Sequence, residues 1–321
     1  MNLLRSTLAG AALALAPHAA TAQGFPEGPV KLVVPLTAGS GADTAGRALA
    51  QALGRLWKQT VVVDNKPGAG GLIGTAAVVN AEATGHTLLV QSVSYAVNPA
   101  IFKKLPYDPL KSLVDVSLIG ATPYVLVTAP DSPYATLKDL VAAAKAQPGT
   151  LPYASVGVGS STHFAAEYLA QATGIKLVHV PYKGGPEAIQ DVMAGRAAFT
   201  MASLSTALAQ ARGGKLRALG VATSARSEAA PEIASIAEQG YPGFDISLWF
   251  GVWAPAATPP AVVARLNADI ARALQDPELT AVFARTGIQP RALGTIAFAA
   301  YVREEMARYQ AVARAAGIEP Q

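Results

Sequence analysis

The sequence predicts an α/β fold in which helices cover both faces of a sheet. Segments rich in branched apolar residues alternate with segments of helical periodicity for most of the 321 residues, which is the pattern of strand–helix–strand units. Two apolar runs, KLVVPL and TVVVDN, are nearly continuous, as is typical of strands buried on both faces of a parallel sheet. The length of the chain favours about two domains.

The expected strands are bounded by turn residues and separated by helical stripes, such as that of Ala45, Leu49 and Leu53. Strands are predicted at Val30–Leu36, Thr60–Asn65, His86–Ser92, Tyr124–Ala129, Leu151–Val156, Lys176–Tyr182, Ala197–Met201, Leu216–Ala222 and Ile246–Ala254. A half-exposed terminal helix is expected near the C-terminus. Two of the strands, those that begin at Tyr124 and Ile246, leave through Pro-rich segments, so the chain is expected to pass twice between two lobes.

The first 22 residues have the features of a secretory signal peptide. Arg5 gives a positive start, Leu8 to Ala16 form an apolar centre, and Ala20-Thr21-Ala22 is a cleavage site that precedes Gln23. The apolar run is shorter than the ~20 residues that a membrane-spanning helix needs. The mature protein is therefore expected to be exported and soluble.

Composition excludes several classes of function. The chain has no cysteine, which excludes disulfides, thiolate metal sites and thiol nucleophiles. Without Arg5, the 25 Lys and Arg become 24 against 21 Asp and Glu, a net charge of +3. These basic residues are scattered, and Lys103-Lys104 is their only adjacent pair, so no nucleic-acid partner is expected. The histidines lack the spacing of a metal motif, so no metal site is expected.

Four turns of small residues precede predicted helices. They are Ala38-Gly39-Ser40-Gly41, Pro67–Gly71, Ala154–His163 and Tyr182–Ala188. At such a turn the first N–H groups of the helix lack backbone partners, and the positive end of the helix dipole favours an anion. Each turn can equally be structural, because glycine turns join strands to helices in most α/β proteins.

Two enzyme interpretations fit the residues poorly. The first turn, with Asp64 ending the next strand, resembles a dinucleotide fingerprint, but Thr44 occupies the place of its third glycine. YASVG, Tyr153 to Gly157, would be a nucleophile elbow if glycine stood where Tyr153 is. Among the histidines, only His163 lies beside a candidate site. Neither a catalytic set nor a cofactor is therefore expected.

The mature chain resembles the extracytoplasmic solute receptors of tripartite tricarboxylate transport systems, often called Bug receptors. The segments that carry the resemblance are VKLVVPLTAGSGADTAGR, VVVDNKPGAGGLIGTAAV, YVLVTAPDSPYATLKDLVAAAKAQPGTLPYASVGVGSSTHFAAEYL, VHVPYKGGPEAIQDVMAGR and GKLRALGVATSARS. The resemblance implies a two-lobed periplasmic binding protein that closes like a flytrap, with mixed, mostly parallel sheets flanked by helices. It implies that residues 23–123 with 247–321 form lobe 1, and residues 124–246 lobe 2.

The resemblance also implies a function. Members bind a small carboxylate, such as a dicarboxylate, a tricarboxylate, an amino acid or an aromatic acid, and deliver it to a membrane permease. This chain is accordingly expected to be a periplasmic monomer that is not an enzyme. A sensor for a signalling partner and an exported α/β enzyme are the alternatives. A receptor would return its ligand unchanged, whereas an enzyme would consume it.

In the family, loops of both lobes hold the carboxylate through backbone N–H groups, hydroxyls and waters. The residues that the resemblance assigns to ligand binding here are Thr37, Ala38, Gly39, Ser40, Gly41, Asp43, Ser94, Asn98, Ser155, Gly157, Gly159, Ser160, Ser161, Thr162, His163, Gly184, Gly185 and Ser203. Asp43 is expected to be a cap or a water anchor, because a bare carboxylate would repel an anion. Leu36 and Ala42 stand where the family often has phenylalanine and threonine, which leaves the identity of the ligand open.

Overall fold

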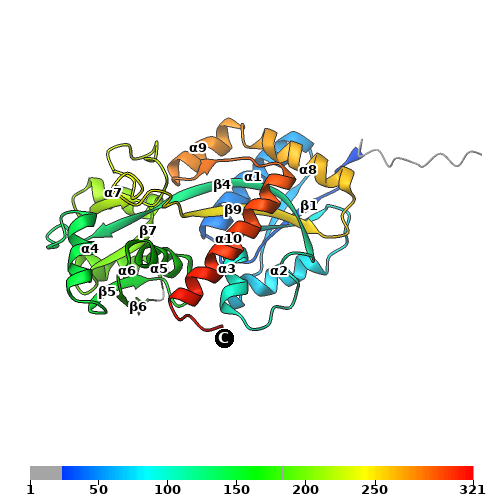
Figure 1. Cartoon of the computed structure of the whole chain (residues 1–321). Coiled ribbons are helices and arrows are strands. Elements are labelled where there is room, and N and C mark those ends of the chain that lie inside the picture. The colour runs from blue at the N-terminus through cyan, green and yellow to red at the C-terminus, as the bar shows by residue number, and fades with distance from the viewer. Residues whose placement is uncertain (1–23, 183, 321) are drawn as a thin grey trace, which may run out of the picture.

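Two sheets lie side by side in the computed structural model, which describes residues 24–182 and 184–320, and two strands run between them (Figure 1). The expected signal peptide, residues 1–22, lies outside the described residues. The fold is that of a two-lobed periplasmic binding protein, as the family resemblance implies. Of the helices in the described ranges, none combines the length and apolar character needed to cross a membrane.

The first lobe is built on a sheet in the order β2-β1-β3-β9-β4. Its strands are β1 (Val30–Val34), β2 (Val61–Asn65), β3 (Thr87–Ser92), β9 (Ser247–Pro255) and the first half of β4 (Leu113–Thr128), and the short β10 (Gln289–Pro290) pairs with β4. β1 is parallel to β2 and β3, whereas β9 is antiparallel to β3 and β4.

The second lobe continues from the same long strand. The order there is β4-β7-β5-β6, and β8 pairs with β4 as well. The strands are β5 (Leu151–Ser155), β6 (Leu177–Pro181), β7 (Phe199–Ser203) and β8 (Arg217–Val221). β5 is parallel to β6 and β7, but β4 is antiparallel to β7 and β8. The sheets are mixed as predicted, but parallel pairing is confined to the outer strands of each lobe and does not predominate.

The long β4 corrects the sequence-based prediction, which placed this strand at Tyr124–Ala129. β4 begins at Leu113, and the register of its pairing with β9 shifts twice, near Asp115 and near Gly120. Polar and small residues in this stretch read as strand breakers, whereas the structure absorbs them in bulges. β4 therefore belongs to both sheets, and Pro123 pairs with Ser247 where the two strands leave the first lobe. The division of the chain at these positions stays a prediction.

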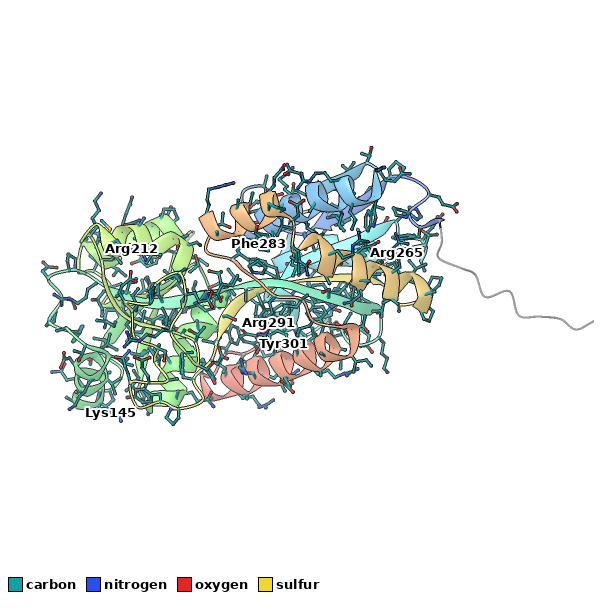
Figure 2. The ribbon with its side chains drawn as sticks, turned by 90° about the horizontal axis from the view of Figure 1, so that it is seen from above. Lys145, Arg212, Arg265, Phe283, Arg291 and Tyr301 are labelled. Carbon is teal, nitrogen blue, oxygen red and sulfur yellow. The ribbon has the colours of Figure 1, made fainter. Side chains whose placement is uncertain are left out.

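Helices cover both faces of each sheet. The first lobe carries α1 (Gly41–Trp57), α2 (Leu72–Val79) after the short η2 (Ala69–Gly71), α3 (Ser94–Ile101), α8 (Pro260–Ala273), α9 (Pro277–Arg285) and α10 (Thr295–Ala315). The second lobe carries α4 (Leu137–Ala146), α5 (Ser161–Thr173), α6 (Gly185–Met193) and α7 (Leu204–Arg212). In the view from above, Lys145 and Arg212 lie in the second lobe, and Arg265 and Phe283 in the first (Figure 2).

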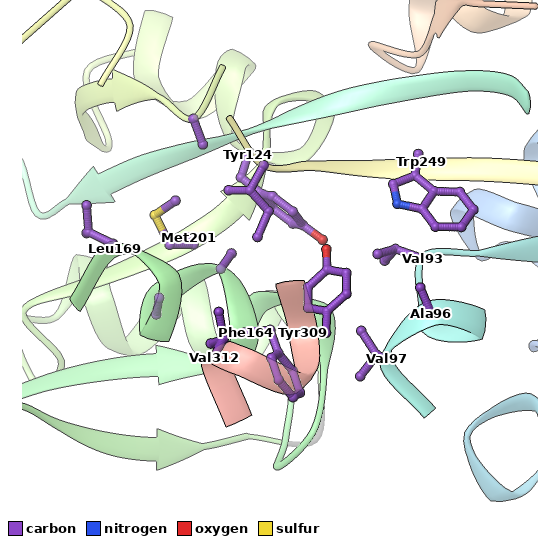
Figure 3. Packing of buried hydrophobic residues seen from close by; sticks show 14 of the residues in the cluster. Val93, Ala96, Val97, Tyr124, Phe164, Leu169, Met201, Trp249, Tyr309 and Val312 are labelled. Atoms are coloured by element: carbon purple, nitrogen blue, oxygen red, sulfur yellow. The ribbon is translucent and has the colours of Figure 1, made fainter. Parts of the chain in front are cut away.

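The hydrophobic core is continuous across the lobe junction. One buried cluster joins α2, α3 and α10 to strands of both sheets, and it includes Tyr124, Phe164 and Trp249 (Figure 3). The rings of Phe164 on α5 and Tyr309 on α10 meet edge to face, with centroids 5.4 Å apart. The terminal helix thus packs against both lobes. Apolar burial on this side holds the junction together, because burying such side chains stabilises by about 1.5–3 kcal/mol each.

Candidate functional site

A cavity of about 220 Å³ lies where β4 and β9 enter the second lobe. The starts of α5, α6 and α7 converge on it, and Tyr124 of β4 and Leu248 of β9 close it on the side of the junction. Four of the predicted ligand-binding residues line it, namely Ser161, Thr162, Gly185 and Ser203. Since each of these helices presents its positive dipole end here, the cavity is suited to an anionic group.

The described lining of this cavity carries no charged side chain. Apolar contacts come from residues such as Val156 and Ile189, and hydroxyls from Ser161, Thr200 and Thr206. A larger groove of about 800 Å³ between α7 and α9 contains none of the predicted site residues. Across residues 24–182 and 184–320, no three His, Asp or Glu side chains gather as metal ligands would. Among the described lining residues, the groups available to a ligand are therefore neutral hydrogen-bonding groups.

The second-lobe loop is fixed by its own side chains. The Oγ1 atom of Thr162 accepts a hydrogen bond from the Val156 N–H at 3.0 Å, which pins the loop to the helix start. Gly157 has φ 119° and Gly159 has φ 74°, values that only glycine adopts without strain. The contact of Thr162 is what a purely structural role would require, so its part in ligand binding stays a prediction.

Ser155 is buried and turned away from solvent. Its Oγ atom lies 2.6 Å from Nε2 of His179, and it exchanges 3.1 Å hydrogen bonds with the N–H and the carbonyl of Gly157. Ser155 therefore stabilises the conformation of the loop through hydrogen bonds on its buried side. Gly184, whose φ is −165°, precedes α6 as its cap residue.

His163 is also buried, and it is stacked on His179 with ring centroids 3.9 Å apart and 7° between the planes. Its Nδ1 atom accepts a hydrogen bond from the Gly159 N–H at 3.0 Å, and its own N–H is capped by Ser160 Oγ at 3.2 Å. Burial, and then the neighbouring His179, lower the pKa of His163 to about 4. His163 is accordingly neutral at pH 7, which agrees with its use as an acceptor.

The first-lobe loop has a buried anchor. Asp43 accepts hydrogen bonds from the Gly39 N–H at 2.9 Å, from Arg47 Nε at 3.0 Å and from Asn65 Nδ2 at 2.9 Å. Burial by itself would raise the pKa of Asp43, but the bonds from Arg47, Gly39 and Asn65 outweigh it and hold this pKa below its ordinary value. Asp43 thus holds the loop while its charge is balanced.

The other first-lobe candidates do not line the cavity. Thr37, Ala38 and Gly39 are exposed on the β1–α1 loop, and Ser40 caps the following helix. Gly41 lies against Phe250, where a Cβ atom would come within 2.9 Å of the ring. These loop residues are brought together with one another, but not with the second-lobe cavity.

The two candidates on α3 are partly structural. Asn98 is buried and donates to the Gly70 carbonyl at 3.2 Å, so it supports the neighbouring glycine turn. Ser94 begins the helix, and its Oγ atom lies 2.9 Å from Ser92 Oγ. Neither residue is on the cavity lining.

Sequence reasoning missed three residues that shape this site. Tyr124 and Leu248 close the cavity, and His179 supports the loop from β6. Burial raises the pKa of the Tyr124 hydroxyl, and the nearby Ser161 side chain opposes that shift. The signal available for His179 was its place in a predicted strand next in sequence to the strand of Ser155, and the structure pairs these two strands in parallel.

The lobes touch on both sides of the junction. Gly159 approaches Ile101 of α3 so closely that a Cβ atom would lie 2.9 Å from Cδ1 of the isoleucine. On the opposite rim, a Cβ atom on Gly287 would lie 3.1 Å from Cβ of Ser205 at the start of α7. Glycines therefore permit close approach of the lobes at both contacts.

Comparison with known proteins agrees with this architecture. The family described as tripartite tricarboxylate transporter family receptor matches residues 45–318. The protein BugT of Bordetella pertussis is 36% identical over 299 residues, which cover 92% of this chain and 92% of BugT.

Two solved structures of relatives hold carboxylates. A structure of Rpa4515 from R. palustris with adipate has a TM-score of 0.80 and 30% identity, and covers 92% of this chain and 100% of that one. A structure of MatC from Rhodopseudomonas palustris with bound malate has a TM-score of 0.74 and 29% identity, and covers 90% of this chain and 99% of that one. The family match spans most of the chain, and this protein therefore belongs to the tripartite tricarboxylate transporter receptors, the Bug family of solute-binding proteins.

Proposed function

We propose that this protein is a periplasmic receptor that binds a small carboxylate between its lobes and delivers it to the permease of a tripartite tricarboxylate transporter. The observation that carries the proposal is the convergence of three helix starts on one cavity at the lobe junction. The relatives with adipate and malate support the carboxylate class.

Neutral donors suit a receptor that has to release its cargo. Helix N–H groups and hydroxyls such as those of Ser161 and Ser203 stabilise an ionised carboxylate without a salt bridge. A desolvated ion pair would be costly to break, and this cost would slow release. The binding site is expected to include the glycine loop of the first lobe once the lobes close around the ligand.

The environment of Ser155 favours a receptor over a hydrolase. A serine beside a histidine is the arrangement of an activated nucleophile, and Ser155 Oγ lies 2.6 Å from His179 Nε2. However, this hydroxyl is buried and is occupied by both backbone groups of Gly157. A substrate carbonyl would have no access to it.

A thermal-shift screen of mono-, di- and tricarboxylates, amino acids and aromatic acids tests the proposal. A true ligand at a hundred times its dissociation constant stabilises the folded state by ~2.7 kcal/mol. The ligand should be recovered unchanged by mass spectrometry after the protein is denatured. Depletion of the ligand would instead support an enzyme, and no stabilisation by any carboxylate would contradict the receptor assignment.

Delivery to a permease is tested in vesicles that contain the membrane subunits. Uptake of the identified carboxylate should depend on adding this receptor. Uptake that is equally fast without the receptor would leave binding intact but contradict the delivery step.

A further inference from the structure

The loops at the starts of α1 and α5 have the same construction. In the first, Gly39 has φ 82°, and Ser40 caps the helix with φ −68° and ψ 162°. Ser40 Oγ accepts from the Asp43 N–H at 3.3 Å, and Asp43 Oδ2 accepts from the Gly39 N–H at 2.9 Å. The Ser40 N–H donates to the Thr37 carbonyl at 3.2 Å.

The second loop repeats each of these contacts in the other lobe. Gly159 has φ 74°, and Ser160 caps its helix with φ −71° and ψ 161°. Ser160 Oγ accepts from the His163 N–H at 3.2 Å, and His163 Nδ1 accepts from the Gly159 N–H at 3.0 Å. The Ser160 N–H donates to the Gly157 carbonyl at 3.2 Å. Among these contacts, the acceptor of the glycine N–H changes from a carboxylate to an imidazole.

The geometry points to Asp43 and His163 as matched positioning residues, each of which locks the ligand loop of its lobe by accepting the N–H of the preceding glycine. This inference rests on the proposed function, in which the two loops face the ligand. With the N–H groups of the glycine and the cap serine tied back, the Ser161 and Thr162 N–H groups have no acceptor within the described chain. Those two groups stay available for an anion, because the first N–H groups of a helix have no carbonyl partner within the helix and Ser160 Oγ accepts from His163 instead.

The two locks respond differently to acid. An imidazole nitrogen accepts a hydrogen bond only when it is unprotonated, so the lock of the second lobe requires neutral His163 with its proton on Nε2. The lock is present at neutral pH and is lost as the pH falls through the pKa of His163. Asp43 is paired with Arg47 and Asn65, so its lock persists to lower pH.

The groups that surround His163 strengthen this contrast. His179 of β6 is stacked on it, and a second positive charge there would be repelled. Tyr153 of β5 stacks at 6.2 Å and donates to Glu167 of α5 at 2.5 Å, which leaves that carboxylate engaged. Across residues 24–182 and 184–320, no acidic side chain is hydrogen-bonded to His163 to stabilise a protonated ring.

Two substitutions at His163 distinguish the presence of a hydrogen-bond acceptor from the ability of that acceptor to be protonated. His163→Asn places Oδ1 where Nδ1 stands and cannot be protonated, whereas His163→Leu removes the acceptor at similar volume. Nitrogen-15 NMR of the wild-type imidazole should show Nδ1 unprotonated at pH 7, and the Gly159 amide should be protected from hydrogen exchange. This protection should persist in acid for His163→Asn and be absent at every pH for His163→Leu.

Affinity for adipate and malate provides the second readout. His163→Leu should bind about tenfold more weakly than His163→Asn at pH 7, the factor that corresponds to one hydrogen bond. Below about pH 5 the wild type should lose affinity faster than His163→Asn, and titration of the ligand itself affects both equally. If neither acid binds the wild type, these two dicarboxylates are excluded as ligands, and the NMR measurement decides the inference about the lock by itself. A protonated Nδ1 at pH 7, or equal Gly159 protection in all three proteins, would overturn the inference.

Discussion

At the scale of single residues, side chains of the candidate site hold the loops by accepting hydrogen bonds from backbone N–H groups. The groups left to bind a ligand are neutral donors. The Thr162 hydroxyl accepts a hydrogen bond from the Val156 N–H, and the His163 imidazole accepts one from the Gly159 N–H. Leaving a part-buried N–H group without an acceptor lowers the free energy of unfolding by about 1–3 kcal/mol, so substitutions can test these contacts.

Thr162→Val keeps the shape of the side chain and removes the acceptor of the Val156 N–H. We expect the free energy of unfolding to fall by about 1–2 kcal/mol, as measured by urea denaturation. Thr280→Val is the matched control, because the Thr280 hydroxyl donates to the Pro277 carbonyl on α9 instead of accepting a loop N–H. Unchanged stability together with weaker ligand binding would assign the Thr162 hydroxyl to the ligand instead.

His163 should make stability depend on pH. Its pKa is lowered from 6.5 to about 4 in the folded protein, so the unfolded chain binds more protons between these values. The contribution is complete above about pH 6.5 and is lost as the pH falls towards 4, with a full size on the order of 3 kcal/mol. Denaturation at several pH values should show this slope, and His163→Asn should flatten it. An identical slope in the variant would contradict the assignment to this residue.

At the scale of secondary-structure elements, β4 connects the two sheets, and its bulges let polar and small residues sit in a long strand. Gly120 is needed there because β10 and the residue before it lie against it. A Cβ atom at this position would lie 2.8 Å from Cγ2 of Ile288 and 2.9 Å from the carbonyl oxygen of Gln289. The space available for a side chain at position 120 is therefore limited by a segment that is distant in sequence.

Gly120→Ala should therefore destabilise the protein by about 1–3 kcal/mol through overpacking. Gly28→Ala is the matched control, since no atom lies within 4 Å of a Cβ atom there. Thermal or urea unfolding compares the two variants. Equal stability of both would show that β10 shifts freely away from β4.

At the scale of the whole molecule, the lobes meet at glycines on both rims of the junction, Gly159 against Ile101 and Gly287 against Ser205. A protein that traps its ligand by closure has to bind more tightly to the closed state than to the open one. How closely the lobes can approach at these contacts therefore contributes to ligand affinity, although the contacts do not touch the ligand.

Gly287→Ala should weaken ligand affinity by roughly threefold to tenfold, because its Cβ would press on Ser205 at a distance of 3.1 Å and hold the lobes apart at this rim. Gly214→Ala is the control, since its φ of 71° resembles the 65° of Gly287 but no atom lies within 4 Å. Small-angle scattering should also show a smaller decrease of the radius of gyration on saturation with ligand. The same affinity and the same compaction in both variants would argue against closure through this contact.

The sequence by itself determined the alternation of strands and helices, because branched apolar runs and helical stripes are local patterns that the chain forms with near neighbours. It also determined the glycine turns, since positive φ values at Gly39 and Gly159 exclude most other residues. The family resemblance added the two-lobed fold, which the comparisons confirm.

Only the tertiary structure decided which candidates face the cavity and which support it. Asp43, Asn98 and Ser155 direct their side chains to partners such as Arg47, Gly70 and His179. Tyr124 and Leu248 reach the site because β4 and β9 cross between the sheets, and the full extent of β4 depends on its pairing with β9. Such outcomes depend on hydrogen-bond partners and burial supplied by segments far away in the chain, so no local pattern encodes them.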